Sequence, residues 1–417
     1  MWMPWRPTSG NFWSRRRPHP DRADMSVPPA AVLTTTDQLF RPARDNEFFP
    51  WRDELPPRRC LPLTCAELSR LAYASLETIG STLEAIGWRL EETLHGARFL
   101  PGQSDTDGFI TQPREGGPRC IVFRGTDSGS VDDLLTDLNA LPRSWDHGLV
   151  VHRGFADEYE SLRRPLQRLG PHPAGTILTG HSLGGALANL ALHDLPGSRL
   201  VTWGAPRVGD PDFARSLPAS TIERYVHACD LVPRVPLESL SRESLTSFLR
   251  RFADGLQDES DLAPRLWNLV EKLDPSAFLQ WQAGKLLGRP LPEYRHAGPT
   301  IYLSCGGSVQ VDPAESYLRS DQRFARGAYR QALAKRFPAS QLFDDFWQSL
   351  KKLALSLPGR DLTDLRRELI DLVRSLAETN PLRIVLLRDF ADHAPCHYVR
   401  ALWNQAREEA QRTPRES

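Results

Sequence analysis

The chain has 417 residues with 52 Lys+Arg and 52 Asp+Glu, so its formal net charge is +0. Hydrophobic residues make up 40% of it and charged residues 25%, which is typical of a globular protein with a sizeable core. A nucleic-acid-binding protein usually carries a basic excess, so that class is disfavoured. Six cysteines are too few for a disulfide scaffold, and no run approaches the roughly 18 apolar residues that cross a bilayer.

Residues 1–62 are rich in Pro and Arg and are expected to form a poorly ordered N-terminal extension. The three arginines at 15–17 are followed by no apolar run, which argues against a signal peptide. Met25 is as good a candidate start as Met1. With no signal visible, the default expectation is a cytoplasmic location, and export by a signal-independent route is the alternative.

Helical periodicity begins near Leu63, and the pattern then alternates between strands and helices up to a C-terminal helix that is expected near Tyr398. This alternation predicts an α/β fold with a mainly parallel sheet. We expect strands at 107–112, 120–124, 176–179, 200–203, 225–227 and 301–303, and helices at 154–169 and 183–193.

Two stretches with helical patterns interrupt the alternation, at about 238–292 and 314–385. Residues 63–417 are therefore predicted to form one domain with two helical insertions. The leucine stripes within the two insertions are typical of core-facing helices. The alternative is a lid or a face that makes peripheral contact with a membrane, for which Phe346 and Trp347 are the candidates.

The main chemical motif is Gly-His-Ser-Leu-Gly at 180–184, between an expected strand and an expected helix. A serine on such a sharp turn holds its hydroxyl out above the sheet, and flanking glycines let the turn close. The helix that follows directs its first N–H groups toward developing negative charge. Ser182 is therefore the candidate nucleophile.

A serine nucleophile needs an imidazole base and a carboxylate that orients the imidazole, in the chain order Ser, Asp or Glu, His. Asp230 follows the short strand at 225–227, where an open α/β sheet presents functional loops. Asp210 and Asp212 are the rivals, but their Gly-Asp-Pro-Asp context is typical of a turn and a helix cap.

The candidate base is His393, which lies in a loop before the expected C-terminal helix. His397 is the main rival, and a loop histidine reaches over a serine more easily than one entering a helix. His296 precedes a strand and is interpreted as a buried, hydrogen-bonded histidine. The histidines at 152 and 227 precede Asp230, on the wrong side for the chain order.

Together these segments resemble the fungal-lipase-like, or class 3, lipases, with the likeness covering about 65–315 and 385–405. The motifs follow the order of the family: Val-Phe-Arg-Gly-Thr at 122–126, Val-His-Arg-Gly-Phe at 151–155, Gly-His-Ser-Leu-Gly-Gly at 180–185, Trp-Gly-Ala-Pro-Arg-Val-Gly at 203–209, Asp-Leu-Val-Pro at 230–233, Tyr-Arg-His-Ala-Gly at 294–298, and Asp-His with a tyrosine at 392–398.

The resemblance implies an α/β-hydrolase fold in which Ser182, Asp230 and His393 form a triad. It further implies that Thr126 and the backbone N–H of Leu183 form the oxyanion hole, and that the segment from Val131 to Leu141 acts as or near an interfacial lid. No metal and no organic cofactor are expected. The long helical insertions and the missing secretion signal are departures from the family pattern.

The resemblance implies a serine carboxylic-ester hydrolase whose partner is a lipid or ester substrate, either an acylglycerol or, in a phospholipase A1-type reaction, a phospholipid. The alternative from a different class is a catalytically silent lipase-like scaffold that binds partners through its insertions. The joint presence of the triad residue types and of Arg-Gly-Thr at 124–126 favours the enzyme. The sequence predicts no oligomeric state.

Overall fold

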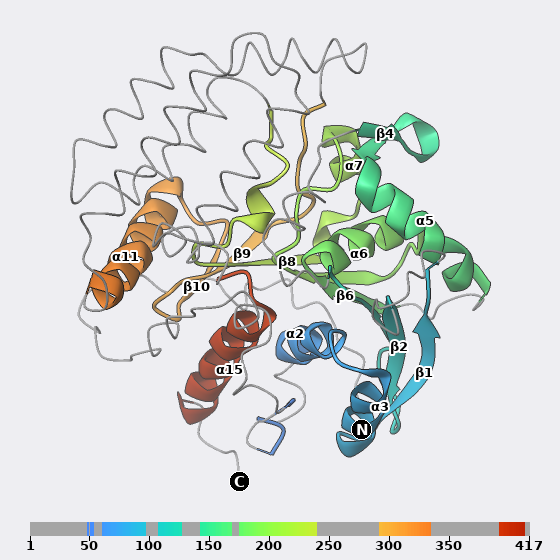
Figure 1. Ribbon diagram of the computed structural model, residues 1–417, viewed down its shortest axis with the longest axis horizontal. Coiled ribbons are helices and arrows are strands. Elements are labelled where there is room, and N and C mark those ends of the chain that lie inside the picture. Colours follow the sequence, from blue (N-terminus) through green and yellow to red (C-terminus); the bar gives the residue numbers. More distant parts are fainter. Residues whose placement is uncertain are drawn as a thin grey trace.

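The computed structural model describes residues 48–49, 51–53, 61–96, 107–126, 142–168, 175–239, 292–334 and 392–412. Within these ranges an eight-stranded sheet is covered by helices on both faces (Figure 1). Every helix in this part of the chain is too short or too polar to cross a bilayer.

The strands are ordered β1-β2-β3-β6-β7-β8-β9-β10 across the sheet. Neighbours from β3 to β9 run parallel, whereas β1, β2 and β10 join antiparallel at the two edges. This mainly parallel sheet flanked by helices confirms the predicted α/β-hydrolase fold. The strands are β1 (Trp88–Leu94), β2 (Gly108–Pro113), β3 (Cys120–Phe123), β6 (Ile177–His181), β7 (Arg199–Trp203), β8 (Ile222–His227), β9 (Thr300–Leu303) and β10 (Val309–Val311).

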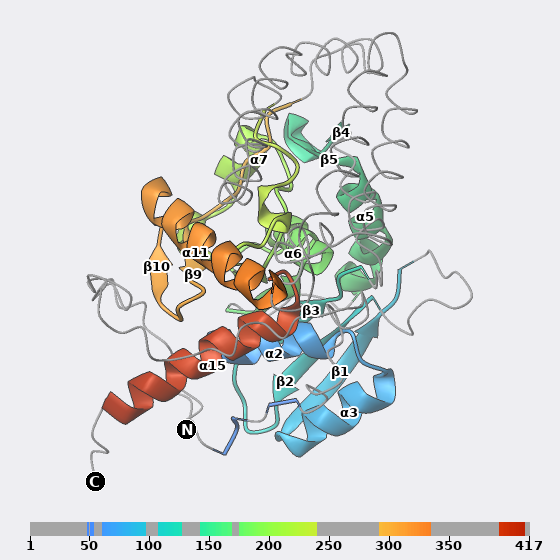
Figure 2. The ribbon, with the colours of Figure 1, turned by 60° about the vertical axis from the view of Figure 1, so that its left-hand side comes forward.

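Successive side chains of each strand point to opposite faces, and this divides the core in two. On β7, Val201 packs with helices α2 (Leu61–Leu71) and α15 (Pro395–Arg412), while Leu200 packs with α5 (Arg153–Arg168) and α6 (Leu183–Asp194). Helices α2 and α15 lie side by side although they are more than 300 residues apart in the chain (Figure 2).

Smaller elements complete the described part of the chain. They are a separate two-stranded sheet, a helix after α2 and a helix after β10, and all lie around the main sheet (Figure 2). These elements are α3 (Leu76–Ala85), β4 (Pro142–Ser144), β5 (Val150–His152), α7 (Pro211–Ser216), α11 (Glu315–Ala334) and the 3₁₀ turns Asp146–Gly148, Ala219–Thr221 and Val232–Arg234.

The central elements follow the sequence prediction within a few residues, including the helix now seen as α5 and the strand now seen as β6. The sequence reasoning did not identify β1, α3, β10 or the β4–β5 hairpin. Helix α11 begins the second predicted insertion. The expected lid at 131–141, the helical patterns at 240–291 and 335–385, and Phe346 and Trp347 lie outside the described residues.

Part of the N-terminal stretch differs from the poorly ordered extension that we expected. Phe49 and Trp51 are only 2% and 5% exposed and pack in the core cluster that contains α2. The backbone N–H of Phe49 donates to Glu67 Oε1 at 3.0 Å, and Glu67 also pairs with Arg70 at 2.7 Å. Phe49 and Trp51 therefore cover α2.

Candidate active site

The turn between β6 and α6 holds Ser182 in a conformation that few non-glycine residues adopt, with φ 58° and ψ −127°. The surrounding glycines permit this turn. A Cβ on Gly180 would lie 2.3 Å from the Gly184 carbonyl carbon, and one on Gly184 would lie 2.2 Å from the Phe123 carbonyl oxygen. Only glycine fits at either position, so the Gly-x-Ser-x-Gly spacing is a steric requirement of this turn.

The two predicted oxyanion donors flank this turn. Leu183 is the first residue of α6, so its N–H belongs to the first helical turn and has no acceptor within the helix. Thr126 ends the described segment after β3, and its neighbour Gly125 packs so closely that an added Cβ would lie 2.6 Å from the His181 carbonyl oxygen. The Arg-Gly-Thr segment therefore passes directly against the serine turn.

Asp230 and His393 meet in the interior, although 163 residues separate them. His393 Nδ1 lies 2.9 Å from Asp230 Oδ2 and 3.1 Å from Oδ1, and both residues are 0% exposed. Asp230 lies in the tight turn after β8, where its own N–H donates to the His227 carbonyl at 2.8 Å. His393 lies just before α15, as predicted.

Two further donors hold the Asp230 carboxylate. The Val232 N–H donates to Oδ1 at 2.9 Å, and the Tyr398 hydroxyl donates to Oδ2 at 2.5 Å. Burial, reinforced by the neighbouring Asp230 carboxylate, raises the pKa of the Tyr398 phenol well above its usual value, so the hydroxyl keeps the proton that it donates. Both carboxylate oxygens are therefore fixed in position behind the imidazole.

The rival carboxylates have structural contacts instead. Asp210 caps α7, because its Oδ1 accepts from the Phe213 N–H at 2.8 Å. Asp212 lies on the exposed side of the same short helix and forms an ion pair with Arg215. This agrees with the turn and cap chemistry expected from their sequence context.

The rival histidines are likewise engaged elsewhere. His397 lies within α15, where its ring stacks on that of His227 with centroids 5.9 Å apart. His296 Nε2 lies 2.6 Å from the Pro233 carbonyl oxygen, so it is hydrogen-bonded as expected, although the residue is only partly buried.

Three residues at this site were not assigned a role from sequence. Tyr398 was noted only as part of a motif. Asp392, which is 0% exposed, accepts from the Cys229 N–H at 3.0 Å and so joins the chain before His393 to the turn that carries Asp230. Gly204 passes so close that a Cβ there would lie 2.7 Å from Asp230 Oδ2 and 2.9 Å from His393 Nδ1. For Gly204, the signal that the sequence offered was a glycine directly after a buried strand.

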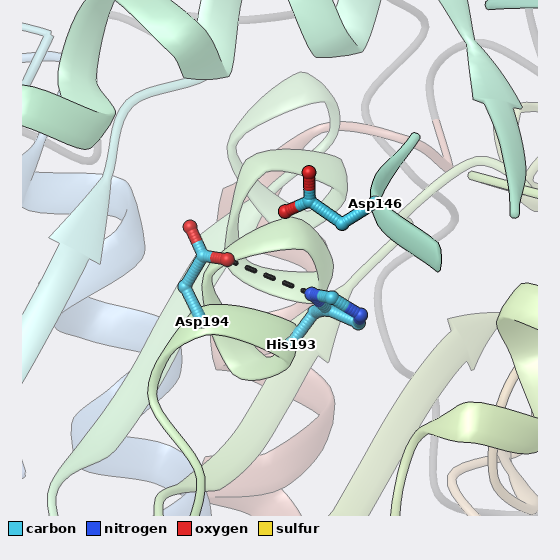
Figure 3. Close-up of side chains that lie close together, drawn as sticks. All are labelled: Asp146, His193 and Asp194. Carbon is cyan, nitrogen blue, oxygen red and sulfur yellow. Dashed lines mark ion pairs between the residues drawn. The ribbon is translucent and has the colours of Figure 1, made fainter. Parts of the chain in front are cut away.

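One group among the described residues could offer three ligand atoms to a metal ion: Asp146, His193 and Asp194, with atoms within 4.8 Å of one another (Figure 3). An arginine already contacts both carboxylates. Arg163 lies 2.5 Å from Asp146 Oδ2 and 2.7 Å from Asp194 Oδ2. The positive charge that a metal would bring is thus supplied by the protein, and the group is best described as an ion-pair cluster.

Part of the chain is similar to known proteins. Residues 120–240 match the family model described as lipase (class 3). The lipase of Rhizopus niveus is 35% identical over 155 residues, which cover 33% of this chain and 39% of that protein. The chloroplastic phospholipase A(1) DAD1 of Arabidopsis thaliana is 35% identical over 147 residues, covering 28% of this chain and 33% of that protein.

A solved structure of the Rhizomucor miehei lipase in complex with its propeptide is 22% identical, covers 64% of this chain and 78% of that one, and superposes with a TM-score of 0.41. The chain spans less than half the length of the curated relatives that it matches. The family match nevertheless includes the serine turn and Asp230, and it confirms the resemblance to the class 3 lipases.

Proposed function

Since residues 120–240 carry the class 3 lipase segment, we propose that the chain hydrolyses carboxylic esters of lipids, with Ser182 as nucleophile, His393 as general base and Asp230 as the group that orients the base. The observation that carries this proposal is the buried His393–Asp230 contact. It joins the two residue types that a serine nucleophile requires, in the chain order of this fold.

The contacts define a role for each atom. Asp230 accepts from His393 Nδ1, so Nε2 of the neutral ring is the basic nitrogen. As Ser182 Oγ attacks the ester carbonyl, Nε2 takes the serine proton, and the charge that develops on the ring is stabilised by Asp230. Nε2 then protonates the departing alcohol. Water repeats the sequence on the acyl-enzyme, releases the acid and restores Ser182.

The tetrahedral intermediate places a negative charge on the former carbonyl oxygen. We assign its stabilisation to Thr126 and to the Leu183 N–H, which lie on either side of the serine turn. A donor of this kind contributes roughly 3 kcal/mol to lowering the barrier. The dipole of α6, whose positive end lies at Leu183, acts in the same direction.

The relatives, which include a lipase and a phospholipase A(1), support a choice of substrate class. We propose acylglycerols and phospholipids as the substrates of this chain. The catalytic residues act on the ester group that both lipids share, so the preference between them is a property of the surfaces around Ser182.

The deciding experiment compares wild type with Ser182→Ala on a soluble short-chain ester, a triacylglycerol emulsion and phospholipid vesicles. We expect the variant to lose at least about 10³-fold in kcat on every substrate that wild type hydrolyses. The better substrate among the two lipids divides lipase from phospholipase. A folded wild type that is as inert as the variant on all three would instead support the catalytically silent scaffold.

A further inference from the structure

His181 lies next to the serine but is directed into the core, where both of its ring nitrogens have partners. Its side chain belongs to the last residue of β6, and the residue is only 1% exposed. Nε2 lies 2.5 Å from the backbone carbonyl oxygen of His393, and Nδ1 lies 2.9 Å from the hydroxyl of Tyr73. His181 thus connects the proposed base with the segment that follows α2.

These two contacts determine which nitrogen of His181 carries its proton. Burial, together with the neighbouring His393, holds the pKa of the His181 imidazole well below its usual range, so the ring is neutral and has one N–H. A carbonyl oxygen can only accept, so the proton is on Nε2. Nδ1 is then an acceptor, and the Tyr73 hydroxyl must be the donor.

The same tyrosine contacts the segment that carries the oxyanion donor. A Cβ built on Gly125 would lie 2.1 Å from the Tyr73 hydroxyl oxygen, so the backbone beside Thr126 rests directly on this phenol. The Arg124 guanidinium lies 5.6 Å from the centre of the Tyr73 ring, and its Nη1 donates to the Ala72 carbonyl at 2.9 Å. Tyr73 is therefore packed between the Arg-Gly-Thr segment and His181.

We propose that Tyr73 is a positioning residue for the proposed hydrolysis: its hydroxyl donates to Nδ1 of His181 and fixes the orientation of that ring, and the Nε2–H of His181 in turn holds the backbone carbonyl of His393 and so the position of the base relative to Ser182. This inference rests on the proposed function. The hydrogen bond and ring contacts described for Tyr73 are to His181 and Arg124, so we assign it a positioning role and not a catalytic one. One phenol thereby links the oxyanion segment, the residue before the nucleophile and the base.

The first test is Tyr73→Phe, which removes the hydroxyl and keeps the ring under Arg124. We expect kcat on a soluble ester to fall about 10- to 100-fold, with KM changed less than about 2-fold, because a misplaced base weakens the chemical step more than substrate binding. The matched control is Tyr159→Phe, which removes a tyrosine hydroxyl elsewhere in the molecule, one that donates to Asp194 at 3.0 Å. A kcat of Tyr73→Phe equal to that of the control overturns the proposal.

A double-mutant cycle tests whether Tyr73 acts through His181. His181→Met removes both hydrogen bonds, so adding Tyr73→Phe to it should lower kcat no further. His181→Gln retains an N–H for the His393 carbonyl and should keep more activity than His181→Met. Independent, multiplying effects of Tyr73→Phe and His181→Met would show that the phenol acts on the oxyanion segment alone, and would refute the route through His181.

Nitrogen NMR of ¹⁵N-histidine-labelled protein gives a readout that needs no turnover. We expect His181 in wild type to be protonated on Nε2 only, and in Tyr73→Phe we expect the Nδ1 resonance to move, because this nitrogen loses the hydrogen bond that it accepts. An Nδ1–H form in wild type refutes the proposal. If wild type hydrolyses no ester while His181 shows the expected tautomer, then the proposed function has failed and the assignment of the Tyr73 hydrogen bond stands.

Discussion

Two of the His–Asp pairs among the described residues differ in the groups that contact their carboxylates. His393 Nδ1 lies 2.9 Å from Asp230, and both side chains are 0% exposed. His193 Nδ1 lies 3.5 Å from Asp194, with side chains that are 16% and 13% exposed. The two pairs share residue types but not geometry, and the groups that contact each carboxylate also differ.

The partners of the two carboxylates differ in charge. Asp194 is contacted by the guanidinium of Arg163, which also pairs with Asp146, so its negative charge is met by an arginine. Asp230 accepts instead from a neutral phenol and a neutral backbone amide, at Tyr398 and Val232. Its charge therefore remains available to a protonated imidazole. We therefore interpret the His193–Asp194 pair, with Arg163, as structural.

The largest expected effect is on kcat, and it should differ between the two His–Asp pairs. Asp230→Asn should lower kcat by about 10⁴-fold, because the amide supports the wrong imidazole tautomer, whereas Asp194→Asn should leave kcat within about 2-fold of wild type. Steady-state kinetics on a soluble ester measure both, with circular dichroism as the control for folding. Comparable losses in the two variants would remove the distinction between the pairs.

The second prediction concerns the contribution of the Arg163 cluster to stability. Arg163→Met removes contacts to Asp146 and Asp194 and the stacking on Trp145, and it should lower the free energy of unfolding by about 1–3 kcal/mol without changing kcat. Urea denaturation gives the value. The control is Arg215→Met at an exposed ion pair, where less than about 0.5 kcal/mol is expected; equal losses would show that the Arg163 cluster contributes no more than a surface pair.

The smallest expected effect is a pH dependence. The hydrogen bond from Arg163 lowers the pKa of Asp146, so this pair stabilises the fold above the unfolded-state value of about 4, and the contribution is lost as the pH falls through the lower folded-state value. Asp146→Asn should therefore lose less thermal stability than wild type on acidification below about pH 4. The difference is modest because the Asp146 side chain is 43% exposed, and parallel Tm curves would contradict it.

The parts of the site that sequence reasoning reached are those governed by short-range rules. Gly180 and Gly184 are required by local sterics, so their spacing identified the turn at Ser182. Chain order and strand ends then selected Asp230 and His393, which the structure brings together.

The contacts of Tyr73 and Asp392 depend on elements that are distant in the chain and become neighbours only in the fold. Tyr73 follows α2 and meets His181 after 108 residues, and Asp392 meets Cys229 after 163. No local pattern encodes such pairings. Strand β1 was missed for a different reason: its sequence, Trp-Arg-Leu-Glu-Glu-Thr-Leu, places two charged residues side by side, and the ladder to β2 is irregular between Leu90 and Glu92.

The docking of α15 against α2 has a consequence for how the protein is made. A ribosome completes Ser182 and Asp230 more than 160 residues before it adds His393, and α15 can pack only on an α2 that was synthesised long before. A nascent chain that has not reached residue 393 holds the nucleophile and the acid without the base. Under the proposed mechanism the chain is therefore an inert precursor until α15 folds back onto α2.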